Sequence, residues 1–209
     1  NVLKFLLIVA ACTLAYLCYQ SVMTPIEFNE VRDAREKVIV ERLIDIRRAE
    51  TEYRNIKGDF TTSFDTLINF VNYEKAKIVL KEGELTDKQL EEGLTEREAV
   101  KQGLIKRDTT YVSMLENLFG ANYPVDSLRY IPFSSPRQEF TLEKAEITTG
   151  SAGIKVKVMA AKAPYVSYLN DLDKQELINL VETTEKLEKF PGLKFGDIEQ
   201  ANNNAGNWE

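Results

Sequence analysis

The sequence predicts an α+β protein in which a long N-terminal helix, an apolar anchor plus an amphipathic stem, packs on an antiparallel β-sheet head. An apolar segment runs from Phe5 to Tyr19, and a charged segment with apolar residues at three- and four-residue steps continues to Lys57. Further along, apolar residues alternate with polar ones on both sides of Thr149. Steps of three and four are typical of an amphipathic helix, whereas alternation is typical of a strand with one buried face.

Composition narrows the function classes. The chain has 209 residues, of which 44% are apolar and 29% charged, and this favours a folded protein with a sizeable core. The net charge is −6, and the interleaved charges give no basic surface for nucleic acid. Histidine, the commonest general base and transition-metal ligand, is missing from the sequence. We expect no enzyme, and we identify no catalytic residue, cofactor or small-molecule substrate.

Short motifs for nucleophilic, phosphate-binding, zinc and calcium sites are also missing from the sequence. Two acidic groupings were considered as calcium ligands: Asp171 with Asp173, and Asp197 with Glu199 near residues 202–204. The first grouping lacks the glycine and the later acidic ligands of a calcium loop. We interpret both groupings as hydrated surface loops and predict no metal site.

Residues 1–24 are predicted to form a transmembrane or assembly helix. The segment from Phe5 to Tyr19 has one polar residue, Thr13, which can bond to its own helix, and flanking apolar residues extend it to roughly 20 residues, about one bilayer crossing. Lys4 predicts that the N-terminal side stays cytoplasmic. The side chains expected to mediate assembly are Phe5, Leu6, Leu7, Ile8, Val9 and Leu14.

Two other readings of this segment involve cleavage. Its apolar core is short enough for a secretory signal peptide, and the stretch from Val9 to Cys12 loosely resembles a lipoprotein cleavage site. A cleaved signal peptide leaves no such segment, and lipoprotein cleavage removes residues 1 to 11; we expect the segment to be retained. Cys12 and Cys18 stand six residues apart, so they point in different directions on a helix and are not expected to form a disulfide.

Residues 25–58 are predicted to form an amphipathic stem helix, with Pro25 able to kink it or to open it. Gly58 stands where a left-handed residue ends a helix. Ion pairs are expected at four-residue spacing, Asp33 with Lys37 and Glu50 with Arg54. The apolar stripe comprises Ile39, Leu43, Ile46, Ala49, Tyr53 and Ile56.

Three further apolar residues, Val38, Val40 and Ile44, lie off this stripe. Either the head wraps around part of the stem, or this second surface packs on neighbouring subunits. The two explanations are compatible.

Residues 59–209 are predicted to form a soluble α+β head, ending in a polar loop in which Trp208 docks. Helices are expected at 63–72, within 86–102, at 114–119 and, capped by Thr184, at 184–189. Extended segments are expected at 77–80, 104–113, 127–133, 140–147, 154–160, 176–181 and 193–195. The pair 140–147 and 154–160 should form a hairpin through the glycine-containing turn 149–153.

The order of these features resembles the type IV pilin and pseudopilin family. An apolar helix, a proline near its end, an amphipathic continuation and the motif A-x-x-x-Y-x-x-x-x-G-x-[YF]-P/T precede the head in that family. The matching residues here are Pro25, Ala49, Tyr53, Gly58, Phe60 and Thr61. The family usually carries Glu at the fifth position, where it pairs with a neighbour's N-terminal amine, whereas this chain has Phe5.

The rest of the sequence resembles a group of uncharacterised bacterial envelope proteins. In that group a serine or threonine between an aspartate and an apolar residue can be O-glycosylated. The candidate sites that the resemblance implies are Thr66, Thr109 and Ser127.

Three functions are therefore compared. The first is a structural subunit of a pilus or pseudopilus-like filament, which associates with its own copies through the N-terminal helix. The alternative is a single-span envelope protein that serves as an accessory subunit of a secretion or transport complex. The expected location is the bacterial cell envelope, with an inner-membrane anchor and a periplasmic head, or an extracellular filament. The third, an anchored enzyme or solute-binding module, requires a pocket of convergent polar groups, for which the sequence offers no candidate.

Overall fold

The computed structural model describes residues 2–82, 95, 98–99, 106–150 and 153–209. It confirms the α+β class, with a long N-terminal helix and antiparallel sheets. The chain forms two compact units, one from Asn1–Phe64 together with Asp126–Glu209, the other from Asp65–Val125. The first unit contains the long helix and most of the predicted head.

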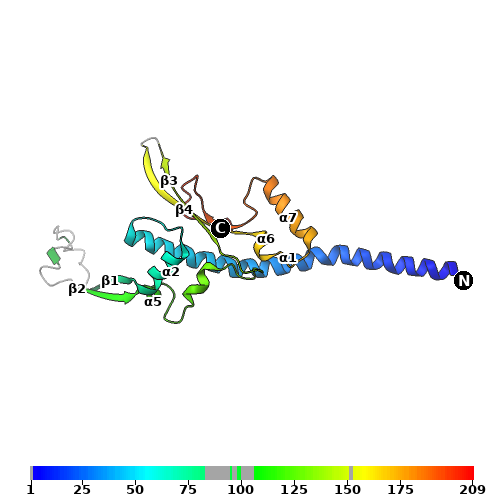
Figure 1. Cartoon of the computed structure of the whole chain (residues 1–209), viewed down its shortest axis with the longest axis horizontal. Coiled ribbons are helices and arrows are strands. Elements are labelled where there is room, and N and C mark those ends of the chain that lie inside the picture. The colour runs from blue at the N-terminus through cyan, green and yellow to red at the C-terminus, as the bar shows by residue number, and fades with distance from the viewer. Residues whose placement is uncertain (1, 83–94, 96–97, 100–105, 151–152) are drawn as a thin grey trace. The chain divides into compact units, whose positions relative to one another are not determined.

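Helix α1 (Val2–Lys57) is one continuous helix of 56 residues (Figure 1). Its length is about 80 Å at about 1.5 Å per residue. Pro25 lies inside it, so the apolar segment and the stem are one element. The predicted stripe is buried over Ile39, Leu43, Ile46 and Ala49, each 0% exposed, whereas Ile56 is 44% exposed. The stripe therefore faces the core over about three turns and leaves it near the helix end.

Within the first unit, α1 packs on a three-stranded antiparallel sheet in the order β3–β4–β5. Its strands are β3 (Thr141–Thr149), β4 (Ile154–Pro164) and β5 (Gly192–Gly196). The unit also contains most of η1 (Val125–Arg129), and the helices α6 (Tyr165–Tyr168) and α7 (Lys174–Lys186). The predicted hairpin and the last strand are confirmed.

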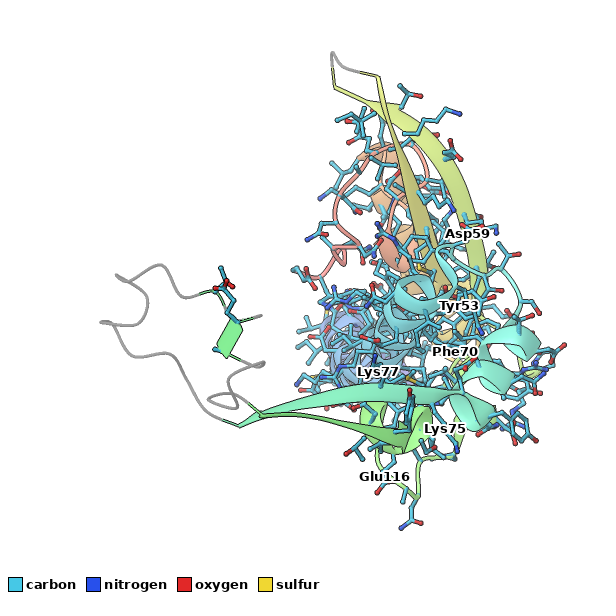
Figure 2. The ribbon with its side chains drawn as sticks, turned by 90° about the vertical axis from the view of Figure 1, so that its left-hand side faces the viewer. Tyr53, Asp59, Phe70, Lys75, Lys77 and Glu116 are labelled. Atoms are coloured by element: carbon cyan, nitrogen blue, oxygen red, sulfur yellow. The ribbon has the colours of Figure 1, made fainter. Side chains whose placement is uncertain are left out.

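The second unit holds helix α2 (Phe64–Tyr73), apart from its first residue, and a two-stranded antiparallel sheet of β1 (Lys75–Glu82) and β2 (Lys106–Ser113). Helix α5 (Met114–Leu118) follows β2. Lys75 and Lys77 on β1, both labelled in Figure 2, are exposed. Ala76 between them is buried. The predicted 63–72 helix is present as α2, and its buried side chains are Phe64, Leu67, Ile68, Phe70 and Val71.

The side chains of strand β4 are exposed at one end of the strand and buried at the other. Near the hairpin turn, where β4 pairs with β3 alone, Ile154 is 60% exposed. The prediction that one face of this strand is buried is therefore wrong at the tip of the hairpin. Further along, four consecutive residues from Val158 to Ala161 are buried, and from Ala160 onward the strand pairs with both β3 and β5. A strand in the centre of a sheet is covered by neighbours on both edges, whereas a hairpin tip has only its partner strand.

Glycine is required where β5 ends. Gly196 has φ of +71°, and a Cβ atom there would lie 2.0 Å from the backbone oxygen of Met159. The C-terminal segment then pairs with β5, because Gly196 N donates to Ala205 O at 2.9 Å and Asn207 N donates to Lys194 O at 3.0 Å. Trp208 is half-buried, with its ring beside Gly206 of the same segment, and its docking on the head stays a prediction.

The predicted strand at 176–181 is wrong, because this segment lies inside helix α7. Asp173 caps the helix: its Oδ1 accepts hydrogen bonds from the backbone N–H groups of Gln175 and Glu176 at 2.9 and 3.0 Å. Thr184 does not start a helix but lies within α7, where its hydroxyl donates to Leu180 O at 2.8 Å. The short apolar run misled the prediction, since periodicity cannot separate a strand from a helix over so few residues.

The extended segment predicted at 127–133 is also wrong over its first three residues, which belong to the 3₁₀ helix η1. The predicted 77–80, 104–113 and 114–119 elements are present as β1, β2 and α5 with shifted ends. The surface helices predicted within 86–102 lie outside the described residues except at 95, 98 and 99.

We predict that Leu43→Ala lowers the free energy of unfolding by about 2–5 kcal/mol, because Leu43 is 0% exposed and its truncation leaves a cavity. Val38→Ala is the matched control, since Val38 is 40% exposed on the same helix. We expect it to change the free energy by about 0.5 kcal/mol or less. Chemical unfolding in mild detergent, followed by the single tryptophan Trp208, measures both; equal losses would contradict the buried stripe.

Candidate assembly segment and its junction with the head

Residues 2–22 of α1 are all exposed in the single chain. Thr13, the polar residue within the apolar core, donates from its hydroxyl to Val9 O at 2.9 Å, as expected. Cys12 and Cys18 are both free, so the expected lack of a disulfide between them is confirmed. The predicted assembly residues expose between 47% and 69% of their surface: Phe5, Leu6, Leu7, Ile8, Val9 and Leu14.

These apolar side chains surround the helix. Consecutive residues are about 100° apart, so Phe5 to Val9 alone complete a turn. A helix that is apolar on every side is covered on every side, as in a membrane or in a bundle of helices. Helix α1 is long and apolar enough to cross a membrane by length and composition.

The head begins to cover α1 at Phe28, which is 5% exposed. From there, three stem arginines bind loops of the head. Arg35 donates to both carboxylate oxygens of Asp171 at 2.6 and 2.7 Å, and also to Tyr168 O. These hydrogen bonds hold the pKa of the Asp171 carboxyl below its usual range.

The other two arginines, Arg42 and Arg47, lie about two and three helical turns after Arg35. Arg42 Nη1 donates to the backbone oxygen and to Oγ of Ser127, the latter at 2.6 Å. Arg47 Nη1 donates to Asn204 O at 3.1 Å and to Glu209 Oε1 at 2.6 Å. The stem therefore contacts three loops that lie 85 to 162 residues away in sequence.

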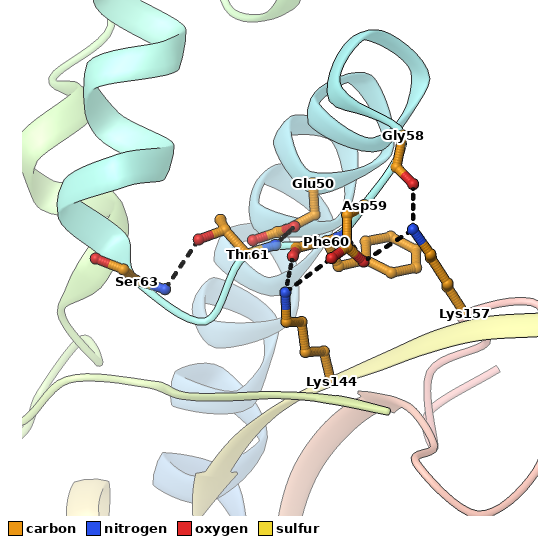
Figure 3. Close-up of polar contacts among 8 residues, drawn as sticks. All are labelled: Glu50, Gly58, Asp59, Phe60, Thr61, Ser63, Lys144 and Lys157. Atoms are coloured by element: carbon orange, nitrogen blue, oxygen red, sulfur yellow. Dashed lines mark hydrogen bonds and ion pairs between the residues drawn. The ribbon is translucent and has the colours of Figure 1, made fainter. Parts of the chain in front are cut away.

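The end of α1 is joined to β3 and β4 by two lysines (Figure 3). Gly58 has φ of +77°, which confirms the predicted left-handed residue. Lys157 Nζ donates to Gly58 O at 2.7 Å, and Lys144 Nζ donates to Phe60 O and Asp59 Oδ2, both at 3.0 Å. Cations near the last carbonyl groups of a helix are favourable because they oppose its dipole.

Glu50 is buried beneath this junction, with 0% exposure. Its Oε2 accepts the Thr61 N–H at 3.1 Å, while Oε1 has no hydrogen-bond partner in the part of the chain that the structure describes. Burial raises the pKa of the Glu50 carboxyl to about 8, against the opposing effects of the Thr61 N–H and the Lys144 charge. The group is therefore mainly protonated at neutral pH.

The predicted ion pairs of the stem are not formed. Glu50 points inward, and the Arg54 guanidinium lies 5.2 Å from the ring centroid of Phe60 instead. Asp33 accepts hydrogen bonds from the neighbouring Arg32, at 2.7 and 3.0 Å, rather than from Lys37. The sequence held a signal for Glu50, because it stands seven residues after Leu43 and so lies on the buried stripe.

The other candidate residues have separate positions. Thr66 is exposed on α2, whereas Ser127 is half-buried and accepts a hydrogen bond from Arg42. Thr109 lies in β2, and its side chain falls outside the described ones. Glycosylation at these three residues stays a prediction. Of the acidic groupings, Asp173 caps α7 and Asp197 bonds Lys194.

Sequence reasoning missed the partners of the stem arginines and of the two sheet lysines. Their spacing placed them on the polar face of a helix or strand, but no local pattern says which distant loop such a side chain meets. Comparison of the chain with protein-family models, curated proteins and solved structures finds no match.

We predict that the stability of the chain falls as pH rises from about 4.5 to about 8. In this window the unfolded Glu50 loses its proton while the folded one keeps it, so the contribution is fully present below pH 4.5 and lost through the folded pKa. The slope reaches at most about 1.4 kcal/mol per pH unit. With no histidine in the sequence, few other groups titrate here, although burial also raises the pKa of Glu36.

Glu50→Gln should flatten this slope, because the amide is neutral at every pH and retains an acceptor for Thr61. Glu41→Gln, at an exposed position of the same helix, should keep the wild-type slope. Unfolding midpoints measured from pH 5 to 9 by Trp208 fluorescence give the comparison. An unchanged slope in Glu50→Gln would show that this carboxyl is ionised in the folded chain.

Proposed function

We propose that this chain is a structural subunit of a pilus or pseudopilus-like filament that assembles through its N-terminal helix. The observation that carries the proposal is the run of exposed side chains over residues 2–22, continuous with a helix whose later half is covered by the head. The resemblance of Ala49, Tyr53, Gly58 and Phe60 to the pilin closing motif supports the same function.

The proposed mechanism is packing rather than catalysis. Side chains such as Phe5, Leu6 and Leu14 lie against the same segment of neighbouring copies, which leaves the heads outside. Against water, burial contributes about 0.8 kcal/mol for each CH₂ group. A subunit waiting in the membrane is already surrounded by apolar chains, so close packing between helices has to supply the gain.

A rigid subunit suits this role. The apolar segment and the stem form one helix, and Arg35, Arg42 and Arg47 fix loops of the head to the stem. Contacts made by the apolar half in a filament therefore also set the orientation of the sheet that packs on α1. Val38 and Ile26, which are 40% and 44% exposed, extend the apolar surface into the stem for the same neighbours.

A second function has one observation in its favour. The first turn of α1 carries no acidic residue, so the pairing of a fifth-position Glu with a neighbour's N-terminal amine has no counterpart. A single-span envelope protein, acting as an accessory subunit of a secretion or transport complex, does not need that pairing. In either case we place the anchor in the inner membrane of a bacterial cell envelope, with a periplasmic head unless the chain enters an extracellular filament.

We predict that Leu7→Lys abolishes assembly while the folded chain persists. A charge near the start of the apolar segment has no partner in a helix bundle, and in a membrane it costs up to about 3 kcal/mol, the value for the bilayer centre. Leu187→Lys is the matched control, because Leu7 and Leu187 are both 63% exposed. Sheared-filament fractions and electron microscopy, with immunoblotting of the membrane fraction, follow both variants.

In a filament, Leu7→Lys leaves monomer and no polymer, and Leu187→Lys leaves polymer unchanged. If the wild-type chain forms no filament and Leu7→Lys instead releases it alone from a complex of fixed stoichiometry, the accessory-subunit function is correct. Loss of polymer in both variants contradicts the assignment of assembly to the N-terminal segment.

A further inference from the structure

A small pocket lies where the loop after η1 meets the stem, within the first unit. Its volume is about 220 Å³, and the side chains that line it come from one residue of α1 and from the 127–137 segment. They are Arg42, Ser127, Tyr130, Ile131, Pro132, Phe133, Ser134 and Arg137. The sequence offered no candidate for such a pocket, because Arg42 stands 85 residues before Ser127.

The wall of the pocket is held by its own hydrogen bonds. Ile131 N donates to Gln138 O at 2.9 Å, which closes the loop, and Tyr130 forms a bridge with Glu139. Inside the loop, the Ser134 hydroxyl donates to Ile131 O at 2.7 Å and accepts the Gln138 N–H at 2.9 Å. The shape of the pocket is therefore formed before any ligand arrives, which lowers the entropic cost of binding.

The charged side chains that line the pocket are all positive. Its lining includes two arginines and no acidic residue, although the chain as a whole carries −6. In the described part of the chain, Arg35 has Asp171 and Arg129 has Glu139 as carboxylate partners. The same part of the chain gives neither Arg42 nor Arg137 a carboxylate partner.

The two pocket arginines are positioned to receive an oxyanion. Arg42 is fixed through Nη1 by Ser127, and the Arg137 guanidinium stacks on Tyr130, 4.1 Å from the ring centroid. Stacking uses the face of the guanidinium and leaves its N–H edge for a carboxylate or phosphate. Such charge-assisted bonds are stronger than neutral ones.

The pocket lining also includes an exposed aromatic ring, that of Phe133. Phe133 is 50% exposed, so its ring is not needed to fill the core. Its φ is +63°, a left-handed conformation that costs free energy for a bulky residue. The Arg35 guanidinium lies 5.4 Å from the centroid of this ring, and the exposed half of Phe133 remains accessible to the apolar face of a ligand at the rim of the pocket.

We propose that this pocket binds an acidic sugar of the hexuronate class. The carboxylate meets Arg42 and Arg137, and the sugar ring lies against Phe133. A volume of about 220 Å³ lies below the roughly 300 Å³ of most small-molecule sites, and it admits one sugar ring. The proposal concerns the head alone, so it holds whether the chain assembles into a filament or serves as a single-span subunit.

The experiment is a ligand-observed NMR titration of the full chain in detergent micelles with sodium glucuronate. Glucose tests the ring without the charge, and inorganic phosphate tests the charge without the ring. We expect saturable binding of glucuronate at millimolar concentration, at least tenfold weaker binding of glucose, and weaker binding of phosphate. One charge-assisted hydrogen bond is worth about 1.5–3 kcal/mol, which is the source of the tenfold figure.

Arg137→Gln is the test variant, because Arg137 is exposed and its replacement leaves the core intact. Arg48→Gln, an exposed position on α1 outside the pocket, makes the same change of net charge. We expect Arg137→Gln to weaken glucuronate binding at least tenfold and Arg48→Gln to leave it unchanged, with both variants folded by circular dichroism.

Phe133→Ala separates the ring contact from the charge, and it should weaken glucuronate more than phosphate. The proposal is overturned if glucuronate does not saturate, if glucose or phosphate binds as well as glucuronate, or if Arg48→Gln weakens binding as much as Arg137→Gln.

Discussion

The buried face of the stem is the interaction on which the first unit depends. Ile39, Leu43, Ile46 and Ala49 lose all of their exposed surface on one side of α1, and the sheet packs on that helix. Burial of this kind contributes about 25 cal/mol for each Å² of apolar surface. Because the helix is continuous through Pro25, the covered half holds the head while the exposed half stays available for lipid or for neighbouring helices.

Polar contacts then fix the position of the head along the stem. Arg35 and Arg47 each reach a carboxylate of a distant segment, while Lys144 and Lys157 on the sheet bind the backbone oxygens of Phe60 and Gly58, just after the end of α1. Exposed ion pairs contribute little each, but hydrogen bonds to backbone oxygens limit sliding of the loops along the helix. These contacts determine where the sheet lies more than how stable it is.

Arg42 connects this attachment with the proposed ligand pocket. It holds Ser127 against the stem and also lines the pocket. The pocket is thus built directly on α1, roughly 30 Å along the helix from the end of the apolar segment near Met23. A subunit arranged in this way presents its pocket at a fixed distance from the surface through which it is anchored or assembled.

By itself the sequence determined the features that depend on neighbouring residues. The apolar segment, the stem, the 63–72 helix, the hairpin and Gly58 at the helix end follow from periodicity and turn chemistry. Where a local pattern was short, as at 176–181, it fitted a strand and a helix equally well, and the cap at Asp173 decided for the helix. Only the tertiary structure decided that Glu50 is buried with one carboxylate oxygen on the Thr61 N–H and that Arg42 meets Ser127. Such contacts join residues far apart in the chain, and their free energy is gained only after the intervening segments have folded between them.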